Sequence, residues 1–125
     1  MRTTERPVFF NLLQIAVPVP AMVSFAHRVS GIVLALSIPF PIYLLQRSLR
    51  SAEDYAWVVG LFAHTTVKAI TIILLWALIH HCLAGIRHLL FDIDIGVGLR
   101  AARASAWAVI WCEFGLLALA LGTLL

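Results

Sequence analysis

The sequence has few charged residues, and this shortage narrows the class of protein. Charged residues make up 12% of its 125 residues, about half of the roughly 25% that is usual in soluble domains. A soluble chain of this length has too much surface to cover with so few charges. Hydrophobic residues reach 62%, well above the usual ~45–50%. We therefore expect most of the surface to face lipid.

Cysteines are also scarce, and other sequence signals are missing. Cys82 and Cys112 lie inside apolar runs without a CxxC or CxxCH motif, which argues against a disulfide or a covalently attached haem and predicts buried free thiols. The first ten residues lack the apolar core of a secretory signal. The sequence has no visible internal repeat, so it does not indicate a transporter built from two halves. The net charge is +3, and the basic residues behind it are expected to contact lipid headgroups. No nucleic-acid partner is predicted.

Three apolar stretches are long enough to cross a bilayer, which takes about 20 residues. We predict an all-α membrane protein that forms a single transmembrane anchor domain over residues 1–125, with a non-spanning arm over 1–23. The predicted helices cover about 24–47, 58–90 and 104–125. In the second, the part expected to cross the membrane is about Lys68 to Leu90, with the preceding turns at the interface. Pro39 and Pro41 are expected to kink the first of these, because proline removes backbone hydrogen bonds. Polar loops are expected over 46–55 and 92–103.

Basic residues predict the orientation of the three spans. Lys and Arg are in excess on the side of the N-terminus and the second loop, and on the other side they are diluted by Glu53 and Asp54. The positive-inside rule then places the N-terminus in the cytoplasm. The basic residues on the N-terminal side are Arg2, Arg6, Arg28, Arg87, Arg100 and Arg103, and those on the other side are Arg47, Arg50 and Lys68.

A first polar cluster opens the first span. Ser24, Arg28 and Gly31 lie at helical spacings of four and three residues, with His27 beside them, so they share one face. An isolated arginine here would be interpreted as reaching toward headgroups, and the serine as a helix cap. Because polar residues in a membrane are costly and three of them share a face, we interpret the cluster as a binding site.

A second polar cluster closes the second span, where His81, Gly85 and His88 share one face. A neutral imidazole is a good axial ligand for haem iron, and a glycine one turn away leaves room for a flat macrocycle. His88 lies nearer the surface, where it could meet a haem propionate. His80 and His64 are interpreted as packing residues.

The two clusters are predicted to converge, because both lie on the same side of the membrane in a three-span topology. His81 is then the one histidine on a suitable stripe at that depth, so the second axial ligand of a haem would come from another chain. This predicts a hetero-oligomer.

These residues resemble the cytochrome b membrane-anchor subunits of succinate dehydrogenase. The resemblance rests on Arg6-Pro7, on Ser24-x-x-His27-Arg28-x-Ser30-Gly31 and on His81-x-x-x-Gly85-Ile-Arg87-His88-x-x-x-Asp92, and it covers nearly the whole chain. It implies one half of a heterodimeric anchor bundle in a bacterial inner membrane. The family usually has a small residue at the position of Asp94, and we expect this change to alter the loop.

The resemblance also implies roles and partners. His81 would be the axial ligand of haem b, Ser24 and Arg28 would bind ubiquinone, and His27 and His88 would lie near the haem propionates. The haem would be shared with a second small anchor subunit. The chain would be a subunit of succinate dehydrogenase that does not bind succinate itself, working with a flavoprotein that carries FAD and an iron–sulfur subunit.

Other interpretations remain open from the sequence. A fumarate reductase anchor that uses menaquinone is of the same general type. A haem-free structural anchor would share the hydrophobicity but would not need the stripe of His81, Gly85 and His88. Glu113, in the middle of the third span, and Lys68 have no assigned role. Trp76 is expected to pack within the bundle.

Overall fold

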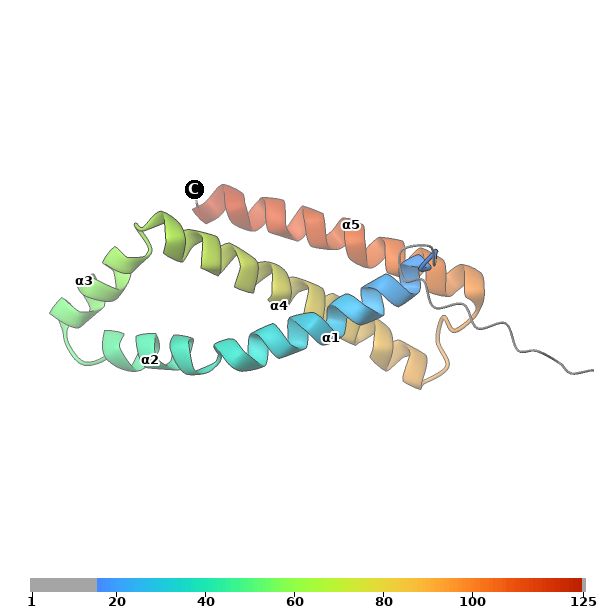
Figure 1. Cartoon of the computed structure of the whole chain (residues 1–125), viewed down its shortest axis with the longest axis horizontal. Helices are drawn as coiled ribbons and strands as arrows, with labels where there is room; N and C mark the ends of the chain where they lie inside the picture. The colour runs from blue at the N-terminus through green and yellow to red at the C-terminus, as the bar shows by residue number, and fades with distance from the viewer. Residues whose placement is uncertain (1–15, 125) are drawn as a thin grey trace, which may run out of the picture.

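The computed structural model describes residues 16–124 as five α-helices (Figure 1). The predicted features at Arg2 and Arg6-Pro7, with the rest of residues 1–15, lie outside the described residues. Three helical stretches are long and apolar enough to cross a membrane, namely Val19–Ser37, Thr65–Asp92 and Leu99–Gly122. The predicted all-α fold with three spans is confirmed. The helices are α1 (Val19–Ser37), α2 (Pro39–Ser48), α3 (Ala52–Leu61), α4 (Thr65–Asp92) and α5 (Leu99–Leu124).

The first predicted helix begins earlier than expected and is divided in two. It starts at Val19 rather than at 24, with Pro18 as an extended N-cap residue and a proline in the first turn, where the missing N–H costs nothing. It is interrupted at Ile38, directly before Pro39 and Pro41, which cannot donate to the preceding turn. The predicted kink is thus confirmed, and α2 continues from α1 after it.

The second predicted helix, over 58–90, was wrong as a single element, but its expected membrane-spanning part, about Lys68 to Leu90, lies within one helix, α4. The chain forms α3, turns through 62–64 and begins α4 at Thr65. The turn falls where His64, Thr65 and Thr66 briefly interrupt the apolar run. The predicted loop over 46–55 is correspondingly short, because the Ser51 side chain accepts the N–H of Asp54 at 3.0 Å and starts α3.

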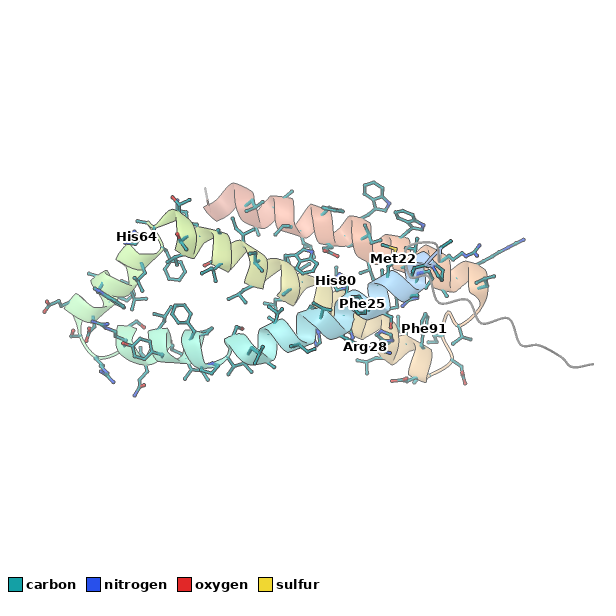
Figure 2. All side chains as sticks on the ribbon, viewed as in Figure 1. Met22, Phe25, Arg28, His64, His80 and Phe91 are labelled. Carbon is teal, nitrogen blue, oxygen red and sulfur yellow. The ribbon has the colours of Figure 1, made fainter. Side chains whose placement is uncertain are left out.

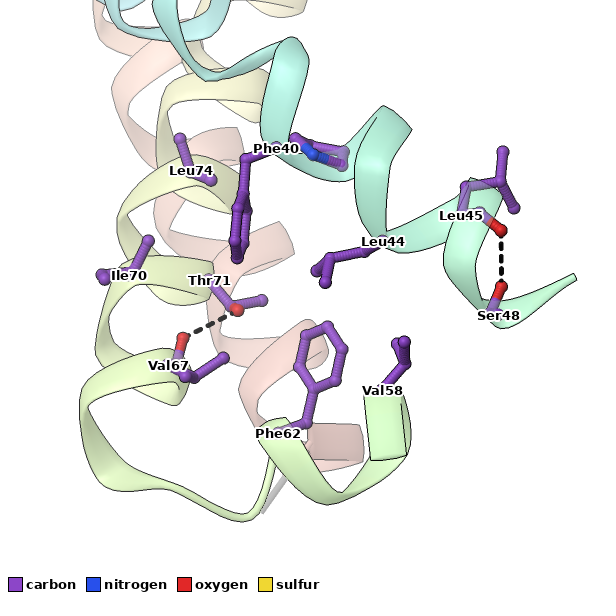
Figure 3. Close-up of a pocket in the computed structure, with 11 residues that line it drawn as sticks. Phe40, Leu44, Leu45, Ser48, Val58, Phe62, Val67, Ile70, Thr71 and Leu74 are labelled. Carbon is purple, nitrogen blue, oxygen red and sulfur yellow. Dashed lines mark hydrogen bonds between the residues drawn. The ribbon is translucent and has the colours of Figure 1, made fainter. Parts of the chain in front are cut away.

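The α2–α3 corner is fixed by a side-chain pair. The Arg47 guanidinium donates to Asp54 Oδ1 at 2.9 Å and lies 3.6 Å from the ring centroid of Trp57. The hydrogen bond to Asp54 raises the pKa of Arg47. A cavity of about 320 Å³ lies between α2, α3 and the start of α4 (Figure 3). The hydroxyls of Ser48 and Thr71 on its wall donate to carbonyls of their own helices, so the cavity is apolar.

The loop between α4 and α5 is shorter than the predicted 92–103. Asp94 has φ 59° and Gly96 has φ 78°, two left-handed residues that reverse the chain. The departure noted at Asp94 therefore does shape the loop. The segment from Leu99 is helical instead of loop, and α5 starts five residues before the predicted 104, because alanine, leucine and arginine favour helix.

Small side chains bring the three long helices together. Ala77, Ala84 and Ala106 are fully buried, and small residues let helices approach closely in a membrane. Both α1 and α5 pack on α4. The outer surface is apolar, including Leu36 and Leu119, which are 78% and 70% exposed, as expected for contact with lipid. The core is formed by Val23, Ala84, Ala106 and Val109 with Val19, Leu83 and Ile110 around them.

The prediction of buried thiols was wrong. Cys82 and Cys112 are both free and exposed. In a bundle whose outer surface faces lipid, an apolar sequence position can point outward as easily as inward. Hydrophobic surroundings in the sequence therefore do not indicate burial.

Candidate functional site

The two polar clusters predicted from the sequence meet where α1 crosses α4. The His81 imidazole Nδ1 lies 3.2 Å from the main-chain oxygen of His27 and 3.4 Å from Ser30 Oγ. A carbonyl oxygen only accepts, so Nδ1 of His81 carries the proton. The other ring nitrogen, Nε2, then has a free lone pair.

The α1 backbone approaches this imidazole closely. A Cβ atom at Gly31 would lie 2.9 Å from His81 Cε1 and 3.3 Å from its Nδ1, so only glycine fits without displacing the ring. Ser30 beside it is fully buried, and its hydroxyl donates to the carbonyl of His27 at 2.9 Å. The Ser30-Gly31 pair thus forms the wall against which His81 is held.

Three imidazoles gather at this interface. The rings of His27 and His81 are stacked, with centroids 4.2 Å apart and an angle of 13° between their planes. His88 is tilted toward His27 at 5.0 Å, and its Nε2 lies 3.4 Å from Ser24 Oγ. The predicted haem and quinone residues are therefore neighbours on facing helices.

Gly85, predicted to leave room for a macrocycle, faces α1, and a side chain of α1 lies over it. A Cβ there would be 3.5 Å from His27 Nε2, an ordinary contact. The space predicted for a macrocycle is taken by the imidazole of His27 in this structure. Gly31, whose neighbour is His81 itself, leaves less room for a side chain than Gly85 does.

Arg28 is exposed and forms no hydrogen bond or ion pair with the other described residues. It follows His27 directly and lies one turn after Ser24 in the sequence of α1, and Figure 2 shows it on α1 near the crossing with α4. Its guanidinium can thus contact a molecule outside this chain.

The interpretation of His80 as a packing residue was incomplete, because both of its ring nitrogens have polar partners. Nδ1 lies 2.7 Å from Glu113 Oε2, and Nε2 lies 3.2 Å from the carbonyl of Val23. Trp76 packs within the bundle as predicted and donates its indole N–H to Glu113. The sequence signal was a glutamate inside a span, which needs a partner, but nothing in the sequence identified His80 as that partner.

His64 was predicted to pack, and this was wrong. It is exposed and caps the start of α4 with extended backbone, at the opposite end of the bundle from the site. Figure 2 shows it far from His80, which lies where the helices cross.

Arg87, in the second motif, faces α5. It is 5% exposed, and it donates to Ser105 Oγ at 3.0 Å and to the carbonyl of Ala102 at 3.2 Å. Its guanidinium also lies 4.4 Å from the ring centroid of Phe91. Arg87 therefore joins α4 to α5, on a different face from His81.

The donor set at the α1–α4 interface fits a haem. An axial histidine usually donates its second ring N–H to a carbonyl or carboxylate, which fixes the ring and leaves Nε2 for the metal. His81 has this arrangement through His27. Among the described residues, no group of three or more His, Cys, Asp or Glu side chains could hold a metal ion together. Of the three imidazoles here, His81 is the one whose Nδ1 lies within hydrogen-bond distance of a main-chain carbonyl, which leaves its Nε2 for a metal.

The fold and this site define a multi-pass helical membrane protein with imidazoles gathered between two of its spans. Residues 2–120 match the family of succinate dehydrogenase/fumarate reductase transmembrane subunits. Proteins named succinate dehydrogenase cytochrome b556 subunit are similar over most of their length. The one from Coxiella burnetii is 37% identical over 111 residues, covering 88% of this chain and 89% of that protein. The one from Paracoccus denitrificans is 30% identical over 109 residues, covering 85% and 82%.

The chain belongs to the family of succinate dehydrogenase/fumarate reductase transmembrane subunits. It is a cytochrome b membrane subunit of the succinate dehydrogenase type. The suspected resemblance is thus confirmed.

Proposed function

We propose that this chain binds haem b and ubiquinone as an anchor subunit of succinate:quinone oxidoreductase. The observation that carries the proposal is the His81 imidazole, whose Nδ1 lies 3.2 Å from the carbonyl of His27. This bond holds the ring and leaves Nε2 as a neutral ligand. Bound haem b would supply a one-electron carrier at this point.

The surrounding residues suit the two predicted ligands. His81 would be this chain's axial ligand, and the second would come from another small anchor subunit. His27 and His88 would lie near the propionates. Gly85 would face the haem once the imidazole of His27 no longer covers it.

Quinone binding is proposed for Ser24 and Arg28. Arg28 is exposed, so its charge can polarise a quinone carbonyl and stabilise negative charge that develops on reduction. Ser24 Oγ is 3.4 Å from His88 and can direct its hydroxyl toward a ring oxygen. The contact between Ser24 and His88 supports a quinone subsite beside the proposed haem subsite.

The proposed assembly has four subunits. A flavoprotein with FAD oxidises succinate, an iron–sulfur subunit carries the electrons inward, and this chain with its partner anchor passes them to ubiquinone in the respiratory chain. The proposed location is the bacterial inner membrane with the N-terminus in the cytoplasm. This orientation places Ser24 and Arg28 at the surface where soluble subunits would dock.

The test is an absorption spectrum of the purified complex from wild type, His81→Leu and His64→Leu. His64 is a matched control because it is an exposed histidine at the start of α4, distant from the site. We expect His81→Leu to lose or strongly alter the haem absorbance and His64→Leu to keep it. Full, unaltered absorbance in His81→Leu would exclude His81 as the ligand.

A further inference from the structure

His80, Glu113 and Trp76 form a buried polar cluster where α1, α4 and α5 meet. His80 is 3% exposed and Glu113 is 6% exposed. The Trp76 indole N–H donates to one carboxyl oxygen of Glu113, and the other oxygen lies 2.7 Å from His80 Nδ1. His80 Nε2 lies 3.2 Å from the carbonyl of Val23. One hydrogen-bonded path therefore runs from α5 through α4 to the backbone of α1.

The donors and acceptors of this path are assigned by chemistry. The Val23 carbonyl only accepts, so His80 Nε2 must carry a proton. The Trp76 indole only donates, so Glu113 Oε1 accepts from it. One proton between His80 Nδ1 and Glu113 Oε2 completes the set. No buried side-chain nitrogen or oxygen of the described residues lacks a partner, which is what allows such polar groups in a membrane interior.

The cluster fixes the position of α1 beside the candidate site. His80 and His81 are consecutive, and they contact carbonyls of Val23 and His27, one helical turn apart in α1. In an α-helix the carbonyl of residue 23 also accepts the N–H of residue 27. A shift of α1 along α4 would break both contacts together, so the pair of histidines sets the register of the two helices.

We propose that Glu113 is a positioning residue for the site between α1 and α4. It holds His80, and His80 holds the α1 segment that carries Ser24 and His27 against His81. The identity of that site rests on the proposed function, whereas the role in register rests on the hydrogen bonds alone. Without Glu113, His80 Nδ1 and the Trp76 indole would lose their partner inside the bundle, and α1 would lose its alignment.

Two substitutions at Glu113 distinguish the loss of its hydrogen bonds from the replacement of its side chain as such. Glu113→Leu has a similar size but no polar atoms. Glu113→Gln keeps an oxygen that accepts from Trp76 and an amide N–H that donates to His80 Nδ1. Phe114→Leu is the matched control, because it changes the next residue, which is 60% exposed on the outer surface of α5.

The assembled, purified complex of each variant is measured in three ways. Hydrogen exchange of the α1 peptide over residues 19–30 should speed up about fivefold or more in Glu113→Leu, as local opening becomes easier. The KM for ubiquinone should rise about fivefold with little change in kcat, the ratio expected from losing one net hydrogen bond. The electron spin resonance signal of the haem should shift. Glu113→Gln and Phe114→Leu should match wild type in all three measurements.

The proposal is overturned if Glu113→Leu exchanges α1 at the wild-type rate, whatever the haem signal does. It is also overturned if Glu113→Gln fails as completely as Glu113→Leu, because hydrogen bonding would then not explain the effect. Hydrogen exchange of α1 can be measured whether or not haem is bound, so wild type and the Glu113 variants can be compared at equal haem content. If His81→Leu kept its haem and the proposed function failed, the exchange comparison would still decide whether Glu113 aligns α1.

Discussion

Replacing Gly31 by alanine should damage the site, although the same change stabilises most helices. Alanine normally gains about 0.5–1 kcal/mol over glycine inside a helix. At Gly31 the new Cβ would lie 2.9 Å from His81 Cε1, whereas ordinary contact begins at 3.4 Å. The ring must therefore move away by several tenths of an ångström.

His81 has little freedom to make that movement. Its Nδ1 is already 3.2 Å from the carbonyl of His27, at the long end of the range for hydrogen bonds. Retreat of the ring breaks this bond, and retreat of α1 disturbs the fully buried Ser30. Overpacking of this kind costs about 1–3 kcal/mol, which outweighs the helix gain. The net effect should be a loss of stability and a displaced imidazole.

The assay compares Gly31→Ala with Gly115→Ala in the purified complex. Gly115 is a matched control, since a Cβ there would meet nothing within 4 Å. Thermal unfolding and haem content per complex are measured for both. We expect Gly31→Ala to unfold at a lower temperature with less haem, and Gly115→Ala to be as stable as wild type or more so. Equal behaviour of the two variants would refute the close contact between Gly31 and His81.

Two further changes test other parts of the bundle. Arg28→Leu should impair quinone reduction while succinate oxidation by an artificial acceptor continues, because the lost cation is proposed to act on the quinone. The control is Arg50→Leu, which removes an exposed arginine at the far end of the bundle. Normal quinone reductase activity in Arg28→Leu would remove Arg28 from the site. Ser105→Ala should lower stability in thermal unfolding by about 1–3 kcal/mol, because Arg87 Nε loses its acceptor; an unchanged unfolding temperature would show that Arg87 finds another partner.

The positions of His27 and His81 illustrate how far sequence periodicity reaches. Residues spaced by three or four share a helix face, so the stripe of His81, Gly85 and His88 was predictable without a structure. The three-span topology then required both clusters to lie at one end of the bundle. The contacts between His27 and His81 agree with that prediction. The roles of these residues toward haem and quinone stay predictions.

The helix ends were less predictable, and each error has a local cause. Hydropathy reports whether a segment suits lipid, but it does not report where a helix ends, so the short polar break at residues 64–66 between α3 and α4 did not prompt a prediction of two helices. The left-handed residues Asp94 and Gly96 reverse the chain within a few residues, and the helix-favouring residues that follow then start α5 sooner than the polarity of the loop suggested. Local backbone geometry, not polarity, decided these boundaries.

The sequence by itself determined that most of the surface faces lipid, how many spans there are and which helix faces carry polar groups. Composition and helical spacing can both be taken from the residues without a structure. Tertiary structure alone decided which polar groups are partners. Glu113 and His80 are 33 positions apart, and His80 and Val23 are 57 positions apart, so no local sequence pattern links them. They meet because small alanines let three helices pack closely, and a buried polar atom in a membrane must take whichever partner that packing brings within reach.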